Sequence, residues 1–452
     1  MTKINIVVLL LDAVSFKYSW LKKESHWPNL YKLKDKFLNF NNHYSVSNNT
    51  RNNLGSITKG LEPSLHKYLN RETSYRSSNF QSLQKYLSKM DYYSLYYATQ
   101  SLHHSENILD NLDFTEVNYL TPSMADYYIP GKKFNKLIID KVNNLKNKNF
   151  FYFFHYTDVH APWEVPENRF KNTKKIKKFI AKNIIGILKR WYWLKFNRNN
   201  KMKNKDTFSK YKLLRGNTLP LGPVVSPERF PLREKYYKCV WDSGTLYNDH
   251  LELHKNCCIY EDQSIFEILN YFKKNSENTI FFMMSDHGNN DLINPKNRSI
   301  EGNVTKNLIH VPLSIFSFDD QLINKFKLKG NCDVITSNTD LFNTILNISG
   351  YEFPKNEFYQ NLLSVDENLK RYIFAEFNSR RQSFGEVKMF DLNNEYYFRI
   401  KSSNTVSELL SENEIINSYN KNEYEIYKNY KIKLNNFNID REKKFIHEKF
   451  FI

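Results

Sequence analysis

Short, continuously apolar runs recur along this chain and constrain its fold more than any other feature. The runs cover residues 4–11, 149–156 and 279–284, and the second is dense in aromatic side chains. A strand that faces water on one side alternates apolar and polar residues, whereas a strand covered on both faces is apolar throughout. The runs therefore predict buried strands of a largely parallel sheet.

Other segments supply the elements that such a sheet needs. Residues 262–274 carry apolar side chains at helical spacing, and residues 80–90 also predict a helix. Residues 92–98 and 311–316 predict two more strands. Alternating helices and apolar strands are typical of a doubly wound α/β fold, in which helices flank a mostly parallel sheet.

Polar residues of types that can act in catalysis or metal binding directly follow the predicted strands. They are Asp12, Asp158, His160, Asp286 and His287. Binding sites of open α/β sheets gather at the carboxyl ends of the strands. We therefore expect these side chains to converge at one edge of the sheet.

The length of 452 residues predicts more than one structural unit. We expect a large α/β domain over residues 1–365 and a small C-terminal α+β subdomain over residues 366–452. Short predicted strands joined by polar turns, at 371–377, 386–391 and 395–400, make the second unit antiparallel.

The segment 168–215 interrupts the α/β pattern. It holds much of the formal net charge of +18, and Asp206 is the one acid between Arg169 and Arg215. Apolar residues between 176 and 191 recur at three- and four-residue steps among the lysines, which predicts a basic amphipathic helix. It is either an interfacial anchor on anionic lipid or a helix packed on the main domain. No nucleic-acid-binding motif accompanies the charge, so we expect no nucleic-acid partner.

The longest apolar run is far shorter than the roughly 18–20 residues that cross a bilayer, and no signal-peptide pattern precedes it. The sequence therefore predicts a cytoplasmic protein, with peripheral contact at the inner face of the membrane left open.

The four cysteines lack zinc-ligand spacing, and we interpret them as buried thiols.

Two carboxylates, an imidazole and a hydroxyl from distant segments form the chemical core of the prediction. Asp12, Asp286 and His287 are ligand types that hold a zinc- or manganese-like cation, and Thr50 offers an alcohol beside Arg51. A bound cation can activate such an alcohol against a tetrahedral ester.

Four segments resemble the alkaline phosphatase superfamily in its sulfatase-like branch. IVVLLLDAVS resembles the first strand with its metal-binding aspartate, and NTRNNLGSITKGLEPSLHKY resembles the nucleophile segment. FFHYTDVHAPWEVP resembles the segment with the substrate histidine, and FFMMSDHGNN resembles the second metal segment. Their order and spacing span about the first 320 residues.

The resemblance implies a role for each matching residue. Asp12, Thr50, Asp286 and His287 match the metal ligands, and Thr50 also matches the nucleophile. Arg51 and His160 match residues that act on the substrate, with His160 able to protonate the leaving group. His310 resembles a later histidine that faces the substrate. The implied substrate is an anionic ester, with a glycan or lipid head group left open, and the cofactor is one divalent ion: Mn, Zn or Ca.

Some positions depart from the sulfatase pattern. Ser47 stands at the sulfatase distance from Arg51, but the spacing to Gly60 favours Thr50, as in the phosphotransferases of the family. Ala13 replaces a second aspartate, so we expect a single ion. Sulfate and phosphate esters both remain open as substrates.

Two alternative functions remain. One is a catalytically silent relative that binds an anionic glycan or lipid, and the other is a membrane-surface protein that binds through the basic segment. We interpret His155 and Asp158 as structural.

Overall fold

The computed structural model describes most of the chain in twelve stretches. They are residues 3–66, 80–99, 113–119, 129–145, 149–160, 247–289, 304–351, 356–378, 384–391, 395–401, 415–417 and 421–447. The basic segment 168–215 lies outside these residues, so the prediction of an amphipathic helix there is not tested.

The three apolar runs form the centre of one sheet. Strand β1 (Asn5–Leu11) lies between β6 (Phe150–Tyr156) and β7 (Thr279–Met284) and pairs with both in parallel. All three strands are buried along nearly their whole length. Continuous apolarity is explained by this position, because neither face of a central strand meets water.

Eight strands make up the whole sheet, in the order β5-β4-β6-β1-β7-β8-β2-β9. The strands not yet given are β2 (Leu38–Phe40), β4 (Tyr93–Ala98), β5 (Glu116–Tyr119), β8 (Leu313–Ser317) and β9 (Gly330–Cys332). Strand β8 runs antiparallel to β7 and β2, and the other pairs are parallel. The α/β prediction with a mostly parallel sheet is confirmed.

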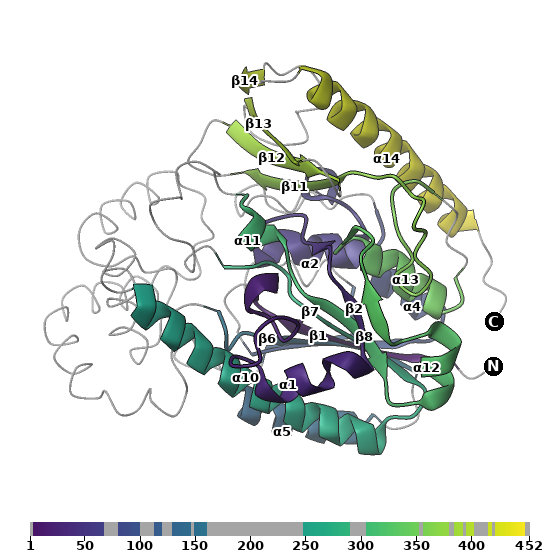
Figure 1. The fold of residues 1–452 in the computed structure, drawn as a ribbon. Coiled ribbons are helices and arrows are strands. Elements are labelled where there is room, and N and C mark those ends of the chain that lie inside the picture. Colours follow the sequence, from purple (N-terminus) through teal and green to yellow (C-terminus); the bar gives the residue numbers. More distant parts are fainter. Residues whose placement is uncertain are drawn as a thin grey trace, which may run out of the picture.

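Helices cover both faces of the sheet (Figure 1). One face carries α1 (Pro28–Leu33), α5 (Gly131–Asn143) and α10 (Tyr247–Asn275), and the other carries α2 (Thr50–Lys59), α4 (Leu83–Lys89) and α13 (Asp340–Ile348). Alternate residues of β1 divide between the two cores: Val7, Leu9 and Leu11 pack toward α10, whereas Ile6, Val8 and Leu10 pack toward α2. This alternation anchors each helical layer to the same strand.

Short elements connect these layers. They are the 3-10 helices η1 (Phe16–Tyr18) and η2 (Lys34–Lys36), the helices α3 (Pro63–His66), α11 (Lys306–Ile309) and α12 (Asp320–Phe326), and the two-stranded sheet of β3 (His43–Tyr44) and β10 (Thr336–Ser337).

A second, antiparallel sheet follows near the C-terminus. It consists of β11 (Ile373–Asn378), β12 (Phe384–Phe390), β13 (Glu395–Lys401) and β14 (Ile415–Asn417), and the long helix α14 (Lys421–His447) follows it. In Figure 1 these elements lie beyond α2 and α13, away from α10. The predicted antiparallel strands are confirmed, whereas no helix was predicted specifically at residues 421–447.

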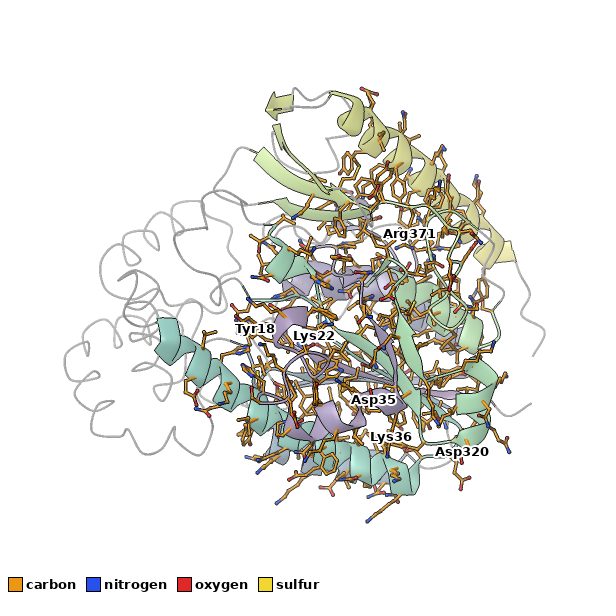
Figure 2. The ribbon with its side chains drawn as sticks, in the orientation of Figure 1. Tyr18, Lys22, Asp35, Lys36, Asp320 and Arg371 are labelled. Atoms are coloured by element: carbon orange, nitrogen blue, oxygen red, sulfur yellow. The ribbon has the colours of Figure 1, made fainter. Side chains whose placement is uncertain are left out.

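Buried ion pairs tie the C-terminal elements to the main sheet's helices. The Arg371 guanidinium lies 2.7 and 3.0 Å from the two carboxylate oxygens of Asp340 on α13. Figure 2 shows Arg371 between the C-terminal sheet and the helices beneath it. Such a bidentate pair fixes orientation as well as distance. Among the described helices, none is both long and apolar enough to cross a membrane.

Candidate functional site

The ends of β1 and β7 bring the two aspartates together. Leu10 of β1 pairs with Met284 of β7. Asp12 lies two residues after Leu10 and Asp286 lies two residues after Met284, so the two aspartates occupy matching positions just beyond neighbouring strands. The Asp12 backbone N–H still donates to the Tyr156 carbonyl, at 2.9 Å. Both carboxylates thus lie at the edge of the sheet where parallel strands end, as the sequence predicted.

The backbone after Asp12 turns sharply to meet Asp286. Ala13 has a φ of 64°, in the left-handed region that non-glycine residues seldom adopt. This turn directs the Ala13 N–H to Asp286 Oδ1, at 3.2 Å, and the Val14 N–H to Ser285 Oγ, at 2.9 Å. A strained conformation of this kind persists only where its surroundings hold it, and such positions concentrate at functional sites.

Thr50 enters the same place as the first residue of α2. Asn49 caps the helix, because its side chain accepts a hydrogen bond from the Asn52 N–H at 3.0 Å. The cap directs Thr50 Oγ1 to within 3.2 Å of His287 Nε2 and 3.5 Å of Asp12 Oδ1. Three segments far apart in the sequence therefore meet around one hydroxyl group.

Ser47, the alternative hydroxyl, lies elsewhere. Its Oγ donates a 2.8 Å hydrogen bond to the Glu376 carbonyl of β11 and accepts one from Asn52 Nδ2 at 3.0 Å. These contacts connect the residues just before α2 to the C-terminal sheet. Between the two hydroxyls, it is Thr50 that faces the carboxylates.

Burial and charge act against each other at this site. Asp12 and Asp286 are fully buried, and His287 is nearly so. Burial alone would raise the pKa of Asp12, but the imidazoles of His160, His155 and His287 hold it well below its usual range. Burial would likewise lower the pKa of His287, but the carboxylates of Asp286 and Asp12 raise it. The site is therefore built around negative charge that a cation would stabilise.

The donor atoms fit a divalent cation. In the described part of the chain, Asp12, Asp286 and His287 are the one group of three such residues whose ligand atoms all lie within 4.8 Å of one another. Asp286 Oδ2 is buried, and no described residue hydrogen-bonds to it. A buried carboxylate oxygen left in this state is costly without a compensating positive charge. Carboxylate, imidazole and hydroxyl groups together suit zinc or manganese.

Gly288 allows the chain to pass closely beneath the ligands. A Cβ added there would lie 1.9 Å from the Asn307 carbonyl oxygen and 2.5 Å from Ser15 Oγ. The neighbouring Asn289 donates its backbone N–H to Ser15 Oγ at 3.0 Å. The glycine is thus required by space rather than by an unusual backbone angle.

Arg51 and His160, the two residues predicted to act on the substrate, lie on different elements. Arg51 is the second residue of α2, beside Thr50, and is half-buried. His160 ends the turn after β6, where its N–H donates to the Thr157 carbonyl at 3.2 Å, and its charge lowers the pKa of Asp12. Both positions suit the predicted contact with substrate, and both roles stay predictions.

His310 is packed in an aromatic stack. Its ring lies between Phe16 and Tyr44, with centroids 4.1 and 4.9 Å away, and its Nε2 lies 2.8 Å from the Asn41 carbonyl oxygen. These contacts place the ring beside β3. The role of His310 toward substrate stays a prediction.

Two buried residues near the candidate ligands were not assigned to the site from the sequence. His155 Nε2 lies 3.4 Å from Asp12 Oδ2, and Asn338 Nδ2 donates to the Asp286 carbonyl at 3.1 Å. His155 is the penultimate residue of β6, so its nearness to the end of β1 follows from strand order. That order is not visible in the sequence.

The family model described as Sulfatase matches residues 4–351. No significant match is found among curated protein sequences.

Solved structures share the fold at low sequence identity. A Vibrio parahaemolyticus protein of the alkaline phosphatase superfamily is 14% identical, with a TM-score of 0.55 over 97% of this chain and 88% of that one. The phosphonate monoester hydrolase SpPMH of Silicibacter pomeroyi is 12% identical, with a TM-score of 0.55 over 99% and 96%. The lipoteichoic acid synthase LtaP of Listeria monocytogenes is 12% identical, with a TM-score of 0.54 over 97% and 92%. At such identities the likeness establishes the fold.

Proposed function

This chain belongs to the sulfatase family, and from that membership we propose a metal-dependent enzyme that cleaves phosphate or sulfate esters through Thr50. Thr50, Asp12, Asp286 and His287 would hold one divalent ion. Arg51 and His160 would bind the substrate, and His160 would also act as a proton donor. The substrate would be an anionic ester, with water or an alcohol as the final acceptor.

One observation supports this proposal above all others. The Thr50 hydroxyl lies 3.2 Å from His287 Nε2 and 3.5 Å from Asp12 Oδ1, although the three residues belong to separate segments. A structural threonine at a helix start would need none of these partners. An activated nucleophile needs charged groups of this kind beside its oxygen.

The residues present would divide the chemistry in the following way. A bound divalent ion would lower the pKa of the Thr50 hydroxyl and polarise an ester oxygen. Thr50 Oγ1, after releasing its proton to water, would form a bond to phosphorus or sulfur as the bond to the leaving oxygen breaks. His160 would give that oxygen its proton, and Arg51 would bind the non-bridging oxygens through its planar fork. Water or an alcohol would then release the threonine ester.

The identity of the nucleophile favours phosphorus chemistry as the first to test. The structures that share the fold name both chemistries: a phosphonate monoester hydrolase and a lipoteichoic acid synthase on one side, and a protein in complex with its disulfated glucosamine substrate on the other. Ser47, which stands at the sulfatase distance from Arg51, is buried and hydrogen-bonded to the C-terminal sheet, whereas the Thr50 hydroxyl lies beside Asp12. We propose a phosphate ester as the first substrate class to test.

The direct experiment combines turnover with detection of the covalent ester. Nitrophenyl phosphate, sulfate and phosphonate esters would be assayed with Mn²⁺, Zn²⁺ or Ca²⁺, and the enzyme would be examined by mass spectrometry for an adduct on Thr50. Thr50→Ala should lower turnover about 10⁴-fold or more and abolish the adduct. Full activity in Thr50→Ala would exclude the covalent route.

A threonine on the same helix provides the matched control. Thr58 Oγ1 donates to the Leu54 carbonyl at 2.6 Å, and the side chain is buried as Thr50 is. Thr58→Ala removes a hydroxyl from α2 without touching the ligands. Its turnover should stay within a few-fold of the wild-type value, which separates loss of the nucleophile from damage to the helix.

Peripheral membrane contact is a separate proposal, which depends on the basic segment 168–215. Flotation with anionic liposomes would test it, using the full chain and a variant that lacks this segment. Equal flotation of both proteins would exclude an anchor there.

A further inference from the structure

The two oxygens of Asp12 face different partners. Oδ1 lies 3.5 Å from Thr50 Oγ1 and 3.6 Å from His287 Nε2, on the side where the ligand atoms converge. Oδ2 lies 3.4 Å from His155 Nε2, on the β6 side. Oδ1 of Asp12 therefore faces the candidate cation site, and Oδ2 faces a buried imidazole.

The His155 ring is itself held in place from behind. Its Nδ1 lies 2.9 Å from the hydroxyl of Tyr96 on β4, and His155, Tyr96 and Asp12 are all fully buried. A neutral imidazole has one donor and one acceptor nitrogen. When Nδ1 accepts the Tyr96 O–H, the ring proton lies on Nε2, the nitrogen nearest Asp12 Oδ2. The Tyr96 hydroxyl thus favours the tautomer whose donor nitrogen is nearest the carboxylate.

Asp286 shows the same division with a different donor. Its Oδ1 accepts the Ala13 N–H at 3.2 Å, and its Oδ2 lies 3.5 Å from His287 Nε2. Each aspartate therefore has one oxygen facing a fixed N–H donor and the other facing His287. The set that remains for a cation is one oxygen from each carboxylate, one imidazole nitrogen and one hydroxyl.

We propose that His155 is a positioning residue, which holds Asp12 Oδ2 so that Asp12 offers a cation only Oδ1. This inference rests on the proposed function, because it assumes that the ligand group binds a divalent ion. At 3.4 Å the contact is longer than an ordinary hydrogen bond. Outer partners of this kind orient the ligand and typically contribute 10- to 100-fold to metal affinity.

The division of both carboxylates also bears on which ion the site prefers. Four ligand atoms, one from each residue, match the coordination of zinc. Calcium takes about six to eight oxygens and often binds both oxygens of a carboxylate. By holding Oδ2, His155 favours zinc over calcium. Removing the ring would free Asp12 to bind through both oxygens.

The test is metal binding by the full-length, chelator-stripped protein, measured by calorimetry with Zn²⁺ and Ca²⁺ in the absence of substrate. His155→Leu should weaken Zn²⁺ binding by about 10- to 100-fold and weaken Ca²⁺ binding less. His155→Gln, whose amide Nε2 can replace the ring donor, should recover most of the Zn²⁺ affinity. Tyr96→Phe should give a smaller loss than His155→Leu, because the donor remains but its tautomer is no longer fixed.

A second buried histidine provides the matched control. His254 on α10 is fully buried and contacts Cys258 and Tyr18. His254→Leu should lower stability but leave Zn²⁺ affinity within a few-fold. Circular dichroism of every variant would establish that it is folded.

The outcomes separate this inference from the proposed function. If the wild-type protein binds no divalent ion, both fail. If it binds Zn²⁺ and His155→Leu binds it equally well, only the positioning role fails. His155→Gln as weak as His155→Leu, or equal losses for the two cations in His155→Leu, would also overturn the role given to the Nε2 donor.

Discussion

Replacing Lys431 with methionine tests how the C-terminal helix is held to the rest of the chain. Lys431 Nζ lies 2.7 Å from Glu376 Oε1 and 3.6 Å from Glu62 Oε2, and its side chain is 1% exposed. Glu376 also accepts hydrogen bonds from the Ser64 N–H, at 2.7 Å, and from the Tyr427 hydroxyl, at 2.9 Å. The lysine is thus the cation between two buried carboxylates.

The loss of unfolding free energy expected for Lys431→Met follows from the burial of the ion pair. Methionine keeps most of the lysine's volume but removes the charge, so the carboxylates of Glu376 and Glu62 would remain buried without it. Breaking a buried ion pair in this way costs about 3–5 kcal/mol. Lys433 provides the control two residues along the same helix: it lies 3.6 Å from Glu357, with side chains 66% and 58% exposed. Lys433→Met should change stability by less than about 1 kcal/mol.

Urea unfolding followed by circular dichroism measures both variants. Lys431→Met should shift the midpoint to clearly lower urea, and Lys433→Met should leave it nearly unchanged. Adding Glu376→Gln to Lys431→Met should recover part of the loss, because one unpaired charge is removed. Equal midpoints for Lys431→Met and the wild-type protein would refute the account of this ion pair.

Two further predictions concern stability. Gly288→Ala places a methyl group against the Asn307 carbonyl oxygen, so it should cost at least about 1–3 kcal/mol in thermal unfolding and weaken Zn²⁺ binding; unchanged values for both would contradict the packing described. Burial, opposed in part by Lys431, raises the pKa of Glu62 above its usual 4.5. The folded state therefore holds this proton more tightly, and the unfolding free energy of the wild-type protein relative to Glu62→Gln should fall as pH rises from 4.5 through the raised pKa. A flat difference across that window would show that Glu62 titrates normally.

The central strands could be predicted from the sequence because their environment leaves a local signal. Burial on both faces requires uninterrupted apolar residues, and this requirement produced the runs that became β1, β6 and β7. The aspartates that follow β1 and β7 then converge because neighbouring parallel strands end at one edge. Local pattern and general topology were enough for this part of the fold.

Other elements leave no such signal. Helix α14 is rich in charged and polar residues, and few of its side chains, among them Tyr427, Lys431 and Leu434, are buried. Its apolar periodicity is accordingly weak, and its contacts with Glu376 and Glu62 bridge a large distance in sequence. A helix whose buried face mixes charged and aromatic side chains cannot be recognised from apolar spacing alone.

The surroundings of the ligands were also hidden in the sequence. The contact between His155 and Asp12 depends on β6 lying beside β1, which is a matter of strand order. The stacking of His310 between Phe16 and Tyr44 likewise joins three separate segments. Sequence motifs identify residue types at a site, whereas the partners that orient them are set by long-range packing.

The most direct test of the central claim is anomalous X-ray diffraction from crystals of the protein grown with Zn²⁺. A divalent ion bound by Asp12, Asp286 and His287 should give an anomalous peak about 2.0–2.2 Å from their nearest ligand atoms, with Thr50 Oγ1 completing the group. A well-ordered site without such a peak, in crystals that contain zinc elsewhere, would contradict the account.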